Sequence, residues 1–105
     1  MASLRTALRA LLGITPTLDL HGLGVRDAVS ETERFLRAAS AEGLSSVRIV
    51  YGKGHRSPGG RGVLRDVIPR WLDTEGRDFV ARYERRLDAS GADGAVLVWL
   101  RSPRE

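Results

Sequence analysis

The sequence passes abruptly from a hydrophobic run into a glycine-rich, cationic stretch and then into helical periodicity. The run is Ile49-Val50-Tyr51, the stretch extends over residues 52–62, and the helical pattern begins at Val63-Leu64. Glycine tolerates positive φ and lets a backbone approach a ligand closely, and the amides at a helix start point toward an anion. The pattern predicts a strand, a basic loop and a helix that together hold a phosphate group. A solvated surface loop without a ligand is the alternative.

The positive charge of the chain is concentrated beside this loop. From Gly52 to Arg70, five cations minus one acid, Asp66, give an excess of +4, which equals the net charge of the whole chain. The five cations are Lys53, Arg56, Arg61, Arg65 and Arg70. The other residues therefore sum to zero. Together with a sequence pI near 10.6, this favours an anionic partner, and nucleic acid before a membrane surface.

Length and composition limit the remaining possibilities. A chain of 105 residues with 42% hydrophobic content forms one domain with a modest core. It has no cysteine, which excludes disulfides and thiolate chemistry and favours a reducing compartment, so we expect a cytoplasmic protein. Arginines interrupt every apolar run before it reaches the about 20 residues of a membrane span.

Apolar spacing predicts the order of the elements. Leucines at helical spacing indicate an N-terminal amphipathic helix within residues 1–17, although its arginines also resemble a transit peptide. The main pattern is βαβαββ, with right-handed crossovers that make the early strands of a four-stranded sheet parallel. The predicted strands are 18–21, 46–51, 79–83 and 95–100, the helices are about 25–41 and 64–72, and residues 102–105 form a tail. Pro69 is expected to kink or tighten the second of these helices.

Two loops follow the first two strands, and both are expected at the carboxyl edge of the sheet, where ligands of α/β sheets gather. Alternation places Asp19 and His21 on one face of the first strand. His21 is the candidate general acid and base, and Asp19 either orients the imidazole or holds a divalent metal. A purely structural turn is the alternative for this pair. Trp71 and Trp99 are expected in the core.

Several motifs together resemble the Smr (small MutS-related) domain. They are Leu18-Asp19-Leu20-His21-Gly22, Gly52-Lys53-Gly54 with Ser57-Pro58-Gly59-Gly60, Val63-Leu64-Arg65, and Gly94-Ala95. The similarity covers residues 18–101 and implies a stand-alone form. It also implies a two-layer α/β sandwich like the C-terminal domain of bacterial translation initiation factor three, with a mixed four-stranded sheet.

The resemblance also implies nucleic-acid binding and a nicking endonuclease activity on DNA or RNA, with Asp19 and His21 matching the pair linked to activity. The expected phosphate contacts are Gly22, Gly52, Lys53, Gly54, His55, Arg56, Ser57, Gly59, Gly60, Arg61 and Arg65. His55 stands where the family motif varies and Arg56 precedes Ser57, which favours binding over catalysis for this loop. Mg²⁺ or Mn²⁺ is the candidate cofactor, and a ribosome or protein partner and a non-catalytic binding module are the alternatives.

Overall fold

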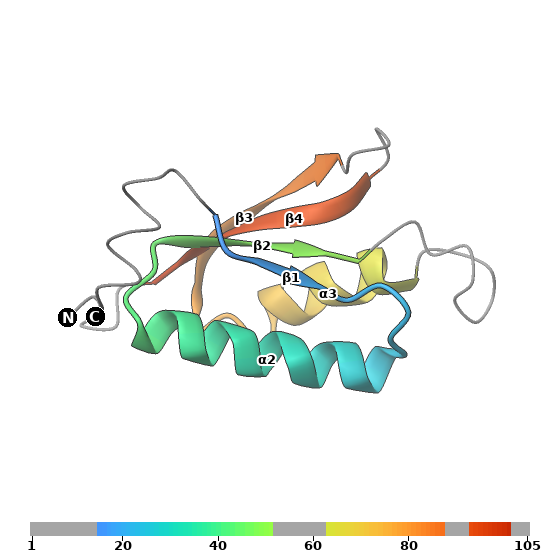
Figure 1. Cartoon of the computed structure of the whole chain (residues 1–105), viewed down its shortest axis with the longest axis horizontal. Helices are drawn as coiled ribbons and strands as arrows, with labels where there is room; N and C mark the ends of the chain where they lie inside the picture. Colours follow the sequence, from blue (N-terminus) through green and yellow to red (C-terminus); the bar gives the residue numbers. More distant parts are fainter. Residues whose placement is uncertain (1–14, 52–62, 88–92, 102–105) are drawn as a thin grey trace.

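The computed structural model describes residues 15–51, 63–87 and 93–101. Its elements follow the predicted order (Figure 1): β1 Thr17–Asp19, α2 Val25–Ala41, β2 Ser46–Val50, α3 Val63–Asp73, β3 Val80–Leu87 and β4 Asp93–Leu100. The N-terminal helix expected within residues 1–17 falls mostly outside the described residues, as does the tail 102–105.

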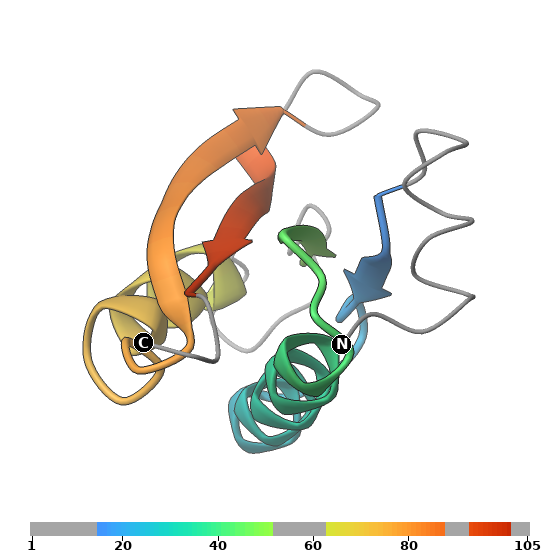
Figure 2. The ribbon, with the colours of Figure 1, turned by 90° about the vertical axis from the view of Figure 1, so that its left-hand side faces the viewer.

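The four strands form one mixed sheet in the order β1-β2-β4-β3. Strands β1 and β2 are parallel, as predicted, whereas β4 is antiparallel to both of its neighbours, β2 and β3. Both α2 and α3 lie against the same face of this sheet (Figures 1 and 2). The predicted two-layer α/β sandwich is therefore confirmed. None of the described helices is long and apolar enough to cross a lipid bilayer.

Helix α2 has the predicted range, and a glycine lies just outside each of its ends. Gly24 is the N-cap, and Gly43 has a φ of 78° just beyond the C-terminus. The amides of Gly43 and Leu44 donate to the carbonyls of Ser40 and Ala39, which is the hydrogen-bond pattern of a Schellman motif. Positive φ strains any residue with a Cβ, so glycine at position 43 stops the helix and turns the chain into β2.

The core lies between the helices and the sheet. Its fully buried side chains include Leu36 from α2, Ile68 and Leu72 from α3, and Val47 and Ile49 from β2. Pro69 lies inside α3 and is buried, and the helix continues past it to Asp73. Trp71 is also buried, as expected. This apolar layer fixes the two βα units against each other and so positions the loops that follow β1 and β2.

The outer parts of the sheet differ from the sequence prediction. Strand β1 ends at Asp19 rather than at residue 21, because the chain turns at His21 and Gly22. Strand β3 runs to Leu87 rather than ending at Tyr83, since its pairing with β4 continues through Arg85 and Arg86. Strand β4 correspondingly begins at Asp93, two residues before the predicted start.

Trp99 does not lie in the core as predicted. It is half-buried and pairs with Ser46 and Arg82, and the alternating residues Val96 and Val98 are the ones buried against the helices. Strand β4 is apolar on both faces, so the apolar pattern does not show which face the helices cover. The prediction therefore placed Trp99 on the covered face, although it lies on the uncovered one. The indole therefore lies on the sheet face opposite α2 and α3.

Candidate active site

The carboxyl ends of β1 and β2 lie side by side at one edge of the sheet. Asp19 pairs with Val50 in the parallel register, and the amide of Leu20 donates to the carbonyl of Val50 over 2.7 Å. Both helices begin at this same edge (Figure 1). The glycine-rich segment starts two residues after Val50, so the chain enters the predicted phosphate-binding loop beside Asp19.

A tight turn after β1 places His21. The amide of Leu23 donates to the carbonyl of Leu20 over 3.1 Å, and Gly22 at the third position has a φ of 84°. His21, at the second position, does not have positive φ, because no described residue other than glycine does. This hydrogen bond, with positive φ at the third position alone, defines a type II turn. A Cβ added at Gly22 would meet nothing within 4 Å, so the backbone conformation rather than space requires glycine here.

Asp19 and His21 contact each other directly. Asp19 Oδ1 accepts the backbone N–H of His21 at 3.0 Å, and His21 Nδ1 lies 3.0 Å from the same oxygen. An ionised carboxylate can only accept, so the Nδ1 proton points to Asp19 and the neutral ring keeps its lone pair on Nε2. The side chains are 75% exposed at His21 and 57% at Asp19, which leaves Nε2 open to an incoming ligand.

These contacts stabilise the ionised form of Asp19. The hydrogen bond from the His21 amide, followed by the one from the ring, holds the pKa of Asp19 below its ordinary value of 3.8, although partial burial opposes the shift. Asp19 is therefore a carboxylate at neutral pH, in a position to orient the His21 ring. This geometry favours the orienting role over the metal-binding role that the sequence left open.

The described residues contain no group of three or more potential metal ligands. The Asp19–His21 pair offers two side chains that could ligate a metal, and Asp19 Oδ1 already accepts two hydrogen bonds. Mg²⁺ prefers several oxygen ligands and Mn²⁺ similar sites, so this pair by itself makes an incomplete set.

Of the predicted phosphate contacts, the structure describes Gly22 and Arg65. Gly22 forms the turn beside His21. Arg65 lies half-buried in the first turn of α3, and its backbone carbonyl accepts a hydrogen bond of 3.2 Å from Arg85. The remaining predicted contacts lie outside the described residues: Gly52, Lys53, Gly54, His55, Arg56, Ser57, Gly59, Gly60 and Arg61.

Sequence reasoning overlooked a cationic and aromatic contact on the sheet. The Arg82 guanidinium lies 3.6 Å from the centre of the Trp99 ring, and Glu84 bonds both Arg82 and Arg86 at 2.8 Å. The alternation of Arg82, Glu84 and Arg86 at period two was the available signal for a solvent-facing strand surface.

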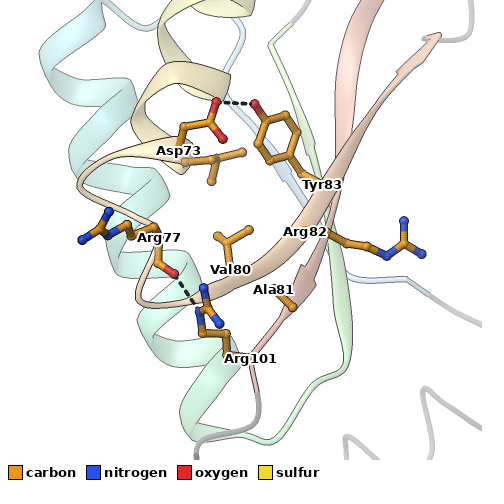
Figure 3. Close-up of a pocket in the computed structure, with 8 residues that line it drawn as sticks. Asp73, Arg77, Val80, Ala81, Arg82, Tyr83 and Arg101 are labelled. Atoms are coloured by element: carbon orange, nitrogen blue, oxygen red, sulfur yellow. Dashed lines mark hydrogen bonds between the residues drawn. The ribbon is translucent and has the colours of Figure 1, made fainter.

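A concave region lies between the end of α3 and the start of β3 (Figure 3). Its volume is about 340 Å³, and the Asp73–Tyr83 hydrogen bond of 2.7 Å closes one end. Arg101 donates to the Arg77 carbonyl at the other end over 2.9 Å. Its lining includes neither Asp19 nor His21, which lie at the end of the opposite edge strand, β1, and in the turn that follows it. The exposed Asp19–His21 pair is therefore separate from this groove.

Comparison with known proteins agrees with the fold and the motifs. Residues 18–101 match the Smr domain family. The chain is 34% identical to the crystal structure of the Smr domain of Thermus thermophilus MutS2, with a TM-score of 0.68 and coverage of 83% of this chain and 99% of that one. A solution structure of the SMR domain of NEDD4-binding protein 2 is 25% identical, with a TM-score of 0.59 and coverage of 84% and 88%.

Longer bacterial proteins share the same region. The chain is 35% identical over 89 residues to Endonuclease MutS2 of Pediococcus pentosaceus and 39% identical over 85 residues to that of Lactiplantibacillus plantarum. These matches cover 85% and 81% of this chain but 10% of each relative. The chain thus spans about a tenth of the length of the curated relatives it matches. The fold, the Asp19–His21 turn and these similarities show that the chain belongs to the Smr domain family.

Proposed function

We propose that this Smr domain binds nucleic acid and cleaves its phosphodiester backbone, with His21 as the acid-base group and Asp19 as its orienting partner. The observation that most supports this proposal is the 3.0 Å contact between His21 Nδ1 and Asp19 Oδ1 at the carboxyl edge of the parallel strands. A carboxylate that fixes one imidazole nitrogen leaves the other available for proton transfer. The similarity to proteins named endonucleases supports the reaction class.

The proposed reaction uses the exposed Nε2 of His21. Nε2 accepts a proton from the attacking hydroxyl or water as the new bond to phosphorus forms. The imidazolium, stabilised by the Asp19 carboxylate, then returns a proton to the leaving oxygen as the old P–O bond breaks. Cationic residues of the glycine-rich loop, Lys53, Arg56 and Arg61, are proposed to hold the phosphate and offset the charge that develops on it.

In this proposal Gly22 and the loop residues from Gly52 to Arg61 approach the phosphate closely, and Arg65 adds charge from the first turn of α3. His55 and Arg56 are assigned to binding. Arg56 stays protonated and is therefore unsuited to act as a base. Mg²⁺ or Mn²⁺ would supply charge neutralisation at the phosphate. None of the steps above passes through the metal, because the Asp19–His21 pair makes an incomplete ligand set.

A non-catalytic nucleic-acid module is the second candidate. Asp19 Oδ1 also accepts the backbone amide of His21, which is the geometry of an Asx turn that stabilises a chain reversal without chemistry. Both side chains are exposed rather than enclosed. In this case structured RNA, branched DNA or the ribosome is the proposed partner, and the cytoplasm is the proposed location in both cases.

Binding and cleavage are tested separately on the full chain. Fluorescence anisotropy with labelled DNA and RNA is followed across a salt series, and cleavage of supercoiled plasmid and structured RNA is followed with Mg²⁺, Mn²⁺ or EDTA. We expect affinity to fall steeply with salt, as phosphate contacts require, and nicked products to accumulate. Tight, salt-sensitive binding without products would favour the binding module. Affinity that does not change with salt would contradict both candidates.

A further inference from the structure

The sheet has one face that no described element covers. Helices α2 and α3 pack on the other face (Figure 2). On that face Val47, Ile49, Val96 and Val98 are completely buried. Residues alternating with these point away from the helices. We refer to this side of the sheet as the open face.

The strand register lines up the residues of the open face in three rows. One row contains Arg82, Trp99 and Ser46, the second contains Glu84, Leu97, Arg48 and Thr17, and the third contains Arg86, Ala95, Val50 and Asp19. The third row therefore ends at the proposed site, because Asp19 holds His21. The open face is continuous with that site across β1, β2, β4 and β3.

Arginine dominates the charge of the part of the open face beyond Asp19. Its described charged residues are Arg48, Arg82, Arg86 and Glu84, so three cations stand against one anion. Glu84 uses Oε2 for Arg82 and Oε1 for Arg86, both at 2.8 Å. Arg48 lies two strands away, about 10 Å from Glu84 at a strand spacing of about 4.8 Å, and is exposed. Its charge is therefore available to a ligand.

Arg82 and Trp99 contact each other on the open face, and we call this pair the Arg82–Trp99 platform. The guanidinium lies 3.6 Å from the centre of the indole ring, and Glu84 fixes it from the side. The Arg82 side chain remains 58% exposed despite these contacts. Nucleic-acid bases stack on aromatic rings and on arginine guanidinium planes, and unpaired bases are free to do so.

We propose that the open face binds a single-stranded segment of the nucleic-acid substrate and leads it to His21. Bases stack on the Arg82–Trp99 platform, and Arg48 contacts the backbone between this platform and the Asp19–His21 pair. From Arg82 to Asp19 the path crosses three strand intervals and four residues, on the order of 20 Å. The inference rests on the proposed function and names unpaired strands as the preferred substrate.

The test uses the full chain and two fluorescein-labelled probes of the same sequence: a single strand of about 15 nucleotides and its blunt duplex. Arg48→Gln and Arg82→Gln are compared with Arg34→Gln. Arg34 is exposed on α2, away from the open face, so the control removes the same charge. Arg82→Lys keeps the charge but loses the plane. We expect both test variants to bind the single strand about threefold to tenfold more weakly, Arg82→Lys to be impaired, and Arg34→Gln to change by less than about twofold.

Tryptophan emission gives a second readout. The chain has two tryptophans, and Trp71 is buried, so quenching by the single strand is expected to come from Trp99 and to disappear in Trp99→Phe. The open-face inference would be overturned if wild type binds the single strand and both Arg48→Gln and Arg82→Gln bind it no more weakly than Arg34→Gln. The proposed function would still stand in that case. No binding of the single strand by wild type, with binding of the duplex retained, would also overturn the open-face inference alone, whereas no binding of either probe or of structured RNA would overturn the function itself. A dimer that dissociates in Trp99→Phe would assign the face to a second copy and contradict the proposal.

Discussion

Replacement of Gly22 tests the turn that positions His21. Gly22 has a φ of 84°, and an added Cβ meets nothing within 4 Å, so the cost of Gly22→Ala comes from the backbone alone. A left-handed conformation costs an L-residue about 1–2 kcal/mol, and the stiffer unfolded chain returns about 0.4–1 kcal/mol of this. We expect a net loss of about 1 kcal/mol in the free energy of unfolding, equivalent to about 4–8 °C in Tm.

Urea unfolding of wild type, Gly22→Ala and Gly22→Asn measures this loss. Asparagine tolerates positive φ better than alanine, so the larger side chain should be the less harmful one. The order of stability should be wild type, then Gly22→Asn, then Gly22→Ala. Gly24→Ala is the neighbouring control, because Gly24 has a φ of −74° and open space around it. Replacing glycine by alanine at this N-cap is expected to lower the free energy of unfolding by about 0.5 kcal/mol. The backbone argument would be refuted if Gly22→Asn lowers the free energy of unfolding more than Gly22→Ala does.

Two further predictions concern stability. At Gly76 an added Cβ would lie 2.6 Å from Cε3 of the buried Trp71 ring, so Gly76→Ala should cost about 1–3 kcal/mol by urea unfolding; a loss no larger than that of Gly24→Ala would contradict this packing. The lowered pKa of Asp19 means that its stabilising contribution is present above pH 3.8 and is lost as pH falls through the folded-state pKa. Asp19→Asn should therefore be less stable than wild type at pH 6, with the gap closing in acid; a gap constant with pH would refute this assignment.

The parts of the fold predicted from sequence are those with strong local signals. Helix α2 was predicted with its observed ends because Gly24 and Gly43 bound a regular apolar stripe. Strand β2 was recognised by its continuous apolar run, which suits a central strand. The full length of β3 was not predicted, because Arg82, Glu84, Arg85 and Arg86 give no apolar alternation and their strand conformation depends on pairing with β4.

The candidate site was predicted in part. Period-two alternation placed Asp19 and His21 on one face of the first strand. The two side chains do contact each other, but they do so across a turn after the strand, which the strand pattern did not include. The open face was not foreseen. Whether Trp99 lies under a helix or on the uncovered side depends on which sheet face α2 and α3 occupy, and sequence spacing carries no information on that choice.

The most direct test of the account is the rate of phosphodiester cleavage by His21→Ala under single-turnover conditions. His55→Ala is the matched control, because it removes the only other histidine. We predict that His21→Ala lowers the cleavage rate about 100-fold or more while binding the probe with nearly wild-type affinity, and that His55→Ala mainly weakens binding. Cleavage by His21→Ala at the wild-type rate would contradict the assignment of His21 as the acid-base group.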